Sequence, residues 1–157
     1  MAQRATDGAV ESVKIDKDTM EPTLGIVGPE GQKPVGICGS GIIDVIAELY
    51  RTSIISSKGQ FVREGKRVAH DEHGMGSYVI AWQKDTGGIK DVVINEVDID
   101  NFIRAKGAIF SATQTMLQSL GFDASAIERV YVAGGIGSGI NMKNAVTIGM
   151  FPDIPLD

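Results

Sequence analysis

The chain has 157 residues, enough for a hydrophobic core, and we expect a single domain over residues 1–157. Its 43% hydrophobic and 22% charged residues are typical of a globular protein, and the net charge of −5 argues against a nucleic-acid partner, which would require excess Lys and Arg. One Cys excludes an internal disulfide, and no apolar run reaches membrane-spanning length, so we expect a cytoplasmic protein with no membrane partner and no signal peptide.

The first third of the chain predicts three strands followed by a helix. Residues 10–16 alternate apolar and polar side chains, and residues 23–27 form a second strand that can pair with them. A short third strand at residues 34–37 leads into a glycine-containing corner. In the helix that follows, one face carries Ile42, Ile43, Ile46, Leu49 and Tyr50, and the opposite face carries Asp44, Glu48 and Arg51. We therefore expect an amphipathic helix with its charged side chains turned away from the core.

The corner between this strand and this helix has two interpretations. A strand, a Gly39-Ser40-Gly41 turn and a helix start can together cradle an anion, so these three residues are candidates for cofactor binding. The alternative is a tight turn in which Ser40 caps the helix, because Ser is a preferred N-cap residue and no Lys or Thr follows to complete a P-loop. Cys38 beside them is interpreted as a small buried thiol.

The middle of the chain carries no predicted chemistry. Residues 52–76 are polar and interrupted by glycines, and we expect them to form an excursion from the core. His70 and His73 flank two acidic residues there, but two His without a third defined ligand do not predict a metal site. Residues 78–82 and 91–95 have strand character and a spacing that favours a hairpin.

The longest predicted helix covers residues 98–120, with Asp98 as its N-cap and Gly121 at its end. Its apolar stripe consists of Ile99, Phe102, Ile103, Ile109, Phe110, Met116, Leu117 and Leu120. Lys106 falls on the apolar side, so its side chain either passes along the edge of the core or points into a cleft.

A glycine-rich turn dominates the C-terminal part. Residues 129–133 have the β-branched and aromatic character of a buried strand, and a helical pattern opens soon after them. Four glycines in the six residues that follow allow the backbone to lie against a ligand, whereas an ordinary tight turn requires only one. A dinucleotide-binding Gly-x-Gly-x-x-Gly turn is excluded because Ile140 occupies its third glycine position. The candidate nucleotide-contacting residues are Gly134, Gly135, Gly137 and Ser138.

This turn resembles the adenosine motif of the ATPase superfamily that contains actin, hexokinase and Hsp70. In that superfamily a strand ends in Gly-Gly and the turn passes under the adenine and the ribose. In its Hsp70 branch, charged residues of a helix comparable to 98–120 flank the adenine, so the resemblance makes Lys106 and Arg104 candidate nucleotide ligands. Residues 144–149 are similar to the last helix of its domain. The resemblance implies an α/β, RNase H-like C-terminal subdomain, incomplete here, with a mixed sheet and flanking helices.

Most of the chain also resembles a narrower family, the C-terminal region of reductive activators of corrinoid-dependent enzymes. The similar blocks are residues 4–14, 33–49, 53–61, 98–109 and 130–155. The resemblance implies a protein that uses ATP with Mg²⁺ to drive reduction of Co(II) corrinoid to Co(I) on a corrinoid protein. It also implies a [2Fe-2S] centre in an upstream domain, because the family's clustered cysteines are absent from this sequence.

Catalytic residues stay unassigned, because the family's Asp-x-Gly-Thr phosphate loops are also absent from these residues. We therefore expect half of a nucleotide cleft, inactive as an ATPase by itself. A homodimer is left open. The alternatives are a non-catalytic docking or dimerisation module of such a protein, and a relative of the sugar and acid kinases in which the same turn serves phosphoryl transfer.

Overall fold

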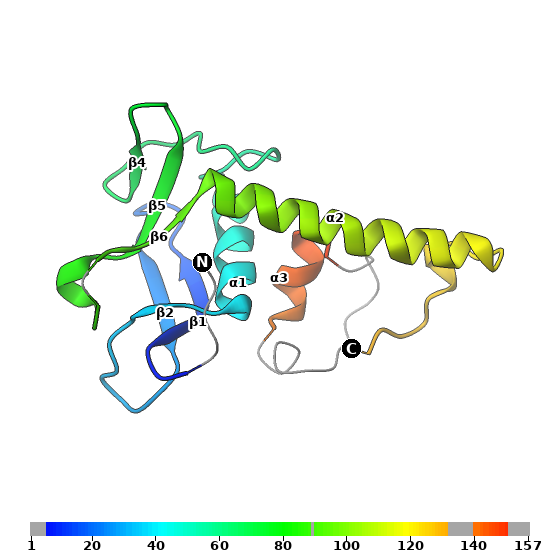
Figure 1. Ribbon diagram of the computed structural model, residues 1–157, viewed down its shortest axis with the longest axis horizontal. Helices are drawn as coiled ribbons and strands as arrows, with labels where there is room; N and C mark the ends of the chain where they lie inside the picture. The colour runs from blue at the N-terminus through cyan, green and yellow to red at the C-terminus, as the bar shows by residue number, and fades with distance from the viewer. Residues whose placement is uncertain (1–5, 89, 132–139, 151–157) are drawn as a thin grey trace.

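A computed structural model describes residues 6–88, 90–131 and 140–150 of the chain (Figure 1). In chain order its elements are β1 (Ala9–Ile15), β2 (Pro22–Ile26), β3 (Gly36–Ile37), α1 (Gly39–Arg51), β4 (Val68–His70), β5 (Gly76–Ala81), the 3-10 turn η1 (Gln83–Asp85), β6 (Val92–Asn95), α2 (Glu96–Ser119), the 3-10 turn η2 (Ala124–Ala126) and α3 (Met142–Thr147). Within the described ranges, no helix is both long enough and apolar enough to span a membrane.

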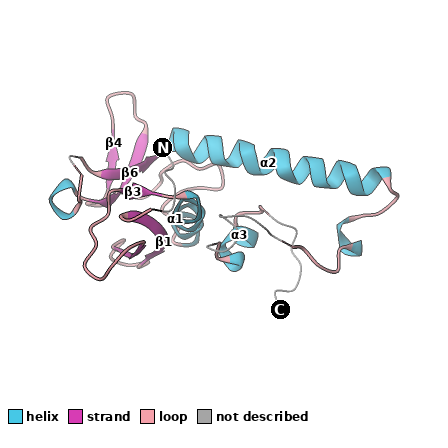
Figure 2. Ribbon diagram, turned by 60° about the horizontal axis from the view of Figure 1, so that its bottom comes forward, coloured by secondary structure: helices cyan, strands magenta, loops and turns pink. Residues whose placement is uncertain are grey.

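The strands form two small sheets at one end of the molecule (Figure 2). The first has the order β2-β1-β3, with β2 antiparallel and β3 parallel to β1. The second has the order β4-β5-β6 and is antiparallel throughout. The predicted pairing of the first two strands and the predicted hairpin of residues 78–82 and 91–95 are both confirmed. The mixed sheet is also confirmed, and a second sheet stands beside it.

The charged face of α1 is buried against β1, contrary to the expectation from its helical pattern. The side chains of Asp44 and Glu48 are buried, and Tyr50, expected in the core, is half exposed. A carboxylate oxygen of Glu48 accepts a hydrogen bond from the backbone N–H of Ile15 at 2.7 Å. A carboxylate oxygen of Asp44 accepts one from the N–H of Val13 at 3.3 Å.

The geometry of the first sheet explains this arrangement. β3 pairs with β1 only at Ala9 and Val10, so the backbone donors farther along β1 need other acceptors. The two carboxylates of α1 occupy that place. Arg51 completes the contact, because its guanidinium binds Glu48 and also donates to the carbonyl oxygen of Ile15, each at 2.7 Å. Polar side chains of a helix therefore replace part of a neighbouring strand.

The two carboxylates respond differently to burial. Burial alone would raise the pKa of Glu48, but the Arg51 guanidinium and the Ile15 N–H together hold this pKa below its usual value. Burial is also the largest influence on the pKa of Asp44, and here it outweighs the hydrogen bonds that oppose it. The pKa of Asp44 is raised even though hydrogen bonds from Asn144 and from the Val13 N–H favour its charged form.

The helix also approaches β1 closely at Gly41. A Cβ atom on this residue would lie 2.2 Å from the carbonyl oxygen of Val10 and 2.8 Å from a side-chain carbon of Ile37. The nearer atom belongs to the backbone and cannot rotate away. Glycine is therefore required at position 41 for α1 to rest on the strand.

Two side chains join the sheets. The hydroxyl of buried Tyr78 on β5 donates to the carbonyl oxygen of Met20 at 2.8 Å, and Met20 lies in the turn between β1 and β2. The guanidinium of Arg67 binds Glu21 beside that turn and also the carbonyl oxygen of Val79. The segment 52–76 strengthens the junction, because three of its apolar side chains enter the core: Ile54, Ile55 and Phe61.

α2 extends well beyond this body (Figure 1). It begins at Glu96, not at residue 98, because Asn95 is the N-cap and forms a capping box with Asp98. The predicted end is confirmed, since Gly121 follows with a φ of +77°. The predicted buried stripe is only partly correct. Ile99 is buried, but the apolar side chains of the second half are exposed because the helix has passed the body: Ile109, Phe110, Met116 and Leu120.

We expect Glu48→Ala to lower the free energy of unfolding by about 1–3 kcal/mol at pH 7, because the buried N–H of Ile15 loses its acceptor. Since the pKa of Glu48 is held below its usual value of 4.5, its stabilising effect is present above that pH and is lost as the pH falls through the lower folded-state pKa. Urea unfolding of both proteins at pH 7 and pH 3.5 measures this. Glu30→Gln on an exposed turn is the control, and an equal difference at both pH values would contradict the prediction.

The close contact at Gly41 generates a second prediction. Gly41→Ala should destabilise the chain by roughly 1–3 kcal/mol, because the added methyl group overlaps the backbone of β1. Gly107 is the matched control, since it also lies in a helix and nothing beyond the neighbouring helix backbone lies within 4 Å of a Cβ atom added there. Gly107→Ala should stabilise the chain by about 0.5–1 kcal/mol. Thermal melts of the two variants test both signs, and a stable Gly41→Ala protein would disprove the close contact.

Candidate functional site

The corner at Gly39, Ser40 and Gly41 is tightly packed. α1 begins at Gly39 with Cys38 as its N-cap residue, and no side chain caps it. The expected capping role of Ser40 is therefore wrong: its buried hydroxyl lies 3.2 Å from the sulfur of Cys38 instead. The Cys38 thiol is buried, as predicted, and also contacts the carbonyl oxygen of Val10. The contact with β1 accounts for Gly41 without a ligand, and anion binding at this corner stays a prediction.

The candidate residues Gly134, Gly135, Gly137 and Ser138 lie outside the described residues. On their N-terminal side a strand was expected at 129–133, and the described residues 129–131 of that range are not in a strand. On their C-terminal side the expected helix is present as α3. The Asn141 side chain caps it by accepting a hydrogen bond from the N–H of Asn144.

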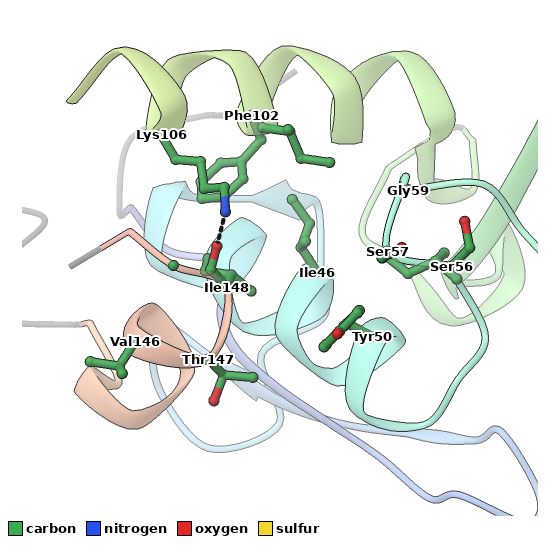
Figure 3. A pocket seen from close by; sticks show the side chains of 13 residues that line it. Ile46, Tyr50, Ser56, Ser57, Gly59, Phe102, Lys106, Val146, Thr147 and Ile148 are labelled. Carbon is green, nitrogen blue, oxygen red and sulfur yellow. Dashed lines mark hydrogen bonds between the residues drawn. The ribbon is translucent and has the colours of Figure 1, made fainter. Parts of the chain in front are cut away.

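Lys106 lines a cavity of about 270 Å³ between α1, α2 and α3 (Figure 3). The walls of this cavity are mostly apolar. They are formed by residues of α1, α2, the end of α3 and the loop after α1: Ile46, Tyr50, Phe102, Ile103, Val146, Ile148, Ser56 and Ser57. The Lys106 ammonium group points toward α3 and donates to the carbonyl oxygen of Ile148, the C-cap residue of that helix. A cation at a helix C-terminus is favourable, because it meets free carbonyl groups and the negative end of the dipole.

Arg104 is not part of this cavity. Its side chain is 77% exposed and pairs with Asp100, one turn earlier on α2, at 2.8 Å. Exposed pairs of this kind contribute little to stability. Of the two charged residues considered on this helix, only Lys106 faces the other helices.

Asp44 is the residue that sequence reasoning missed. Its second carboxylate oxygen accepts a hydrogen bond from the side-chain amide of Asn144 at 2.8 Å. One carboxylate thus contacts β1 and α3 while its own backbone belongs to α1. The available signal was a pair of carboxylates four residues apart on a helix whose other side chains are nearly all apolar or small.

The side chains around the Lys106 cavity are apolar, hydroxyl-bearing or, in Lys106 itself, basic. No carboxylate, His or Cys is among those that line the cavity with Lys106. No group of three or more His, Cys, Asp or Glu side chains placed to hold a metal ion occurs in the described part of the chain. His73 only contacts the neighbouring Glu72 at 3.5 Å, and both are strongly exposed.

Comparison with known proteins shows the family of the chain. The structure is similar to that of a reductive activator for corrinoid, iron–sulfur protein, with a TM-score of 0.88 and 45% sequence identity over 97% of this chain and 24% of that one. The sequence is 31% identical over 162 residues to the corrinoid activation enzyme RamQ of Eubacterium limosum, covering 98% of this chain and 27% of RamQ. The chain thus spans about a quarter of the length of these relatives. All 157 residues match the family described as the C-terminal domain of RACo, the ASKHA domain, and the chain belongs to that family.

Proposed function

We propose that the protein containing this chain is a reductive activator that uses ATP to restore the Co(I) state of a corrinoid bound to a partner protein. The observation that carries the proposal is the family match over residues 1–157, together with two similar proteins that are both named as corrinoid activators. These names favour an activator over a sugar or acid kinase. The same names are compatible with a docking module of such a protein, and the function test below distinguishes a docking module from an active reductase.

In this proposal the chain binds the adenosine end of ATP. The glycine turn that contains Gly134, Gly135, Gly137 and Ser138 lies beneath the nucleoside, and the corner at 39–41 is the second candidate contact. The described residues support this through α3, which follows the turn closely and is attached to α1 by Asn144 and to α2 by Lys106. A turn attached to a fixed helix is suited to holding a rigid ligand.

The phosphate end of ATP needs further residues. Magnesium prefers oxygen ligands, often carboxylates and phosphate oxygens, and the family's Asp-x-Gly-Thr phosphate loops are absent from these 157 residues. Mg²⁺ and the phosphates would therefore be held mainly by other parts of the protein. ATP hydrolysis would supply the free energy, and a [2Fe-2S] centre elsewhere in the protein would supply the single electron that converts Co(II) to Co(I).

The function test uses the complete protein and its corrinoid partner. We expect ATP-dependent formation of Co(I), followed by its absorption spectrum, and phosphate release that the 157-residue chain alone does not show. Tight ATP binding without either activity would favour the docking module. The absence of ATP binding by the complete protein would refute the proposal.

Gly135→Val tests the glycine turn within the complete protein. If the turn lies against the nucleoside, a branched side chain should abolish most of the ATP affinity and leave the melting temperature nearly unchanged. If the turn serves folding only, the same change should cost stability, roughly 1–3 kcal/mol where the backbone is strained. A thermal melt and an ATP titration on one variant separate the two. Wild-type affinity with a lowered melting temperature would refute the nucleotide assignment of the turn.

A further inference from the structure

The second half of α2 lacks charged side chains. The first half carries five of them: Glu96, Asp98, Asp100, Arg104 and Lys106. Residues 107–122 contain no Asp, Glu, Lys, Arg or His. The composition changes next to Lys106, whose side chain reaches the end of α3, and from there the helix extends beyond the body (Figure 1). A helix that faces water normally carries charged residues on its solvent side, so this composition is typical of a helix inside a protein.

The apolar stripe of α2 continues through this uncharged half without a cover. In the first half, Phe102 and Ile103 pack against the core. Ile109 and Met116 follow Phe102 at intervals of seven residues, and Leu120 comes four residues later, so they lie on the same side of the helix. Their side chains are 46%, 59% and 64% exposed. Single exposed apolar residues are ordinary, whereas a continuous exposed stripe marks a surface on which something packs.

The other sides of this half of α2 are also uncharged. The remaining residues are small or carry a neutral amide or hydroxyl group, and all of the following are exposed: Ala108, Ser111, Ala112, Gln114, Thr115, Gln118 and Ser119. Short side chains allow another backbone to approach closely. No side of residues 107–122 therefore has the charged residues that a permanently solvated surface carries.

We propose that residues 107–122 form an internal interface helix: in the complete protein they are enclosed by an apolar surface of the same polypeptide that lies outside these 157 residues. The size of the relatives supports this occupant, because the chain covers 24% and 27% of their lengths and its family is described as a C-terminal domain. The inference rests on the proposed function only in placing this chain within a longer protein.

Two other occupants fit the composition less well. A corrinoid protein that docks and leaves again would use a transient interface, and such interfaces are about as polar as the rest of a protein surface. A second copy related by a two-fold axis would cover one side of the helix and leave the other sides in water. The absence of charge all around residues 107–122 instead favours permanent enclosure.

Photocrosslinking in the complete protein identifies the occupant. Benzoylphenylalanine replaces Met116, and mass spectrometry after illumination locates the crosslinked peptide. We expect a crosslink within one polypeptide, to a residue outside the 157 residues of this chain. The matched control has the same photoreactive residue in place of Arg104, whose side chain is 77% exposed on the charged half of α2, and it should give little crosslinking.

Hydroxyl-radical footprinting provides a second measurement on the unmodified complete protein. Met116 should be oxidised nearly as slowly as Met20, which is buried in the core. His73 is 80% exposed and should be oxidised rapidly, which confirms that the radicals reach the surface. Rapid oxidation of Met116 would show that this side of α2 remains in water and would overturn the proposal.

The crosslink has three contrary outcomes. A crosslinked dimer on a denaturing gel would identify a second copy, and a crosslink that requires added corrinoid protein would identify a transient partner. A crosslink to residues 132–139 or 151–157 would show that this chain covers the helix by itself. Each of these results overturns the proposal. Neither measurement involves ATP, so a complete protein that gives the expected crosslink but binds no ATP refutes the proposed function alone.

A charge placed on the stripe tests the same enclosure through stability. Met116→Lys should lower the melting temperature of the complete protein by several degrees, because the ammonium group would be buried without a partner. Val62→Lys is the control, since Val62 is 61% exposed, close to the 59% of Met116, and it is followed directly by the charged Arg63 and Glu64. Its melting temperature should be unchanged. An unchanged melting temperature for Met116→Lys would contradict the enclosure.

Discussion

The hydrogen bonds from the backbone of β1 to the carboxylates of α1 are the interaction on which the other elements depend. β3 covers only the first residues of one edge of β1, and beyond them Asp44 and Glu48 accept the N–H groups of Val13 and Ile15. Burying carboxylates is costly unless their oxygens are hydrogen-bonded, and the partners found here meet that condition. No buried side-chain nitrogen or oxygen in the described part of the structure lacks a hydrogen-bond partner.

The same carboxylates connect the sheet to the region of the candidate site. Asp44 reaches Asn144 on α3, and α3 in turn receives Lys106 from α2. These hydrogen bonds therefore join the first sheet, α1, α2 and α3. Breaking a buried charged contact is more damaging than its net contribution suggests, because the remaining partner is left buried without compensation. For this reason substitutions among these hydrogen-bonded residues should affect several elements at once.

The sequence predicts the regular parts of the fold well. The strand pair at the start, the hairpin at 78–82 and 91–95, the helix after the glycine corner and the stop at Gly121 follow from alternation, helical periodicity and turn chemistry. These signals are local. The start of α2 was placed too late because Asp98 is the third helical residue of a capping box, and Asn95, three residues earlier, was the signal that would have corrected it.

What the sequence does not predict is set by distant partners. Helical periodicity assigns charged residues to solvent, and it contains nothing about an incompletely paired strand that can receive Asp44 and Glu48. The side of α2 occupied by Lys106 is predictable, but its partner lies 42 residues away on a short helix. The second half of α2 is apolar in pattern but exposed in the structure. An apolar pattern identifies a surface suited to burial, but it does not predict which element covers that surface.

Amide hydrogen exchange of Val13 and Ile15 tests most directly whether the α1 carboxylates act as a substitute for a strand. These two amides should exchange as slowly as the amides in the ladder between β1 and β2, because each has a buried acceptor. In Glu48→Ala, exchange at Ile15 should become fast while the ladder between β1 and β2 stays protected. Rapid exchange of both amides in the unmodified protein would contradict the account.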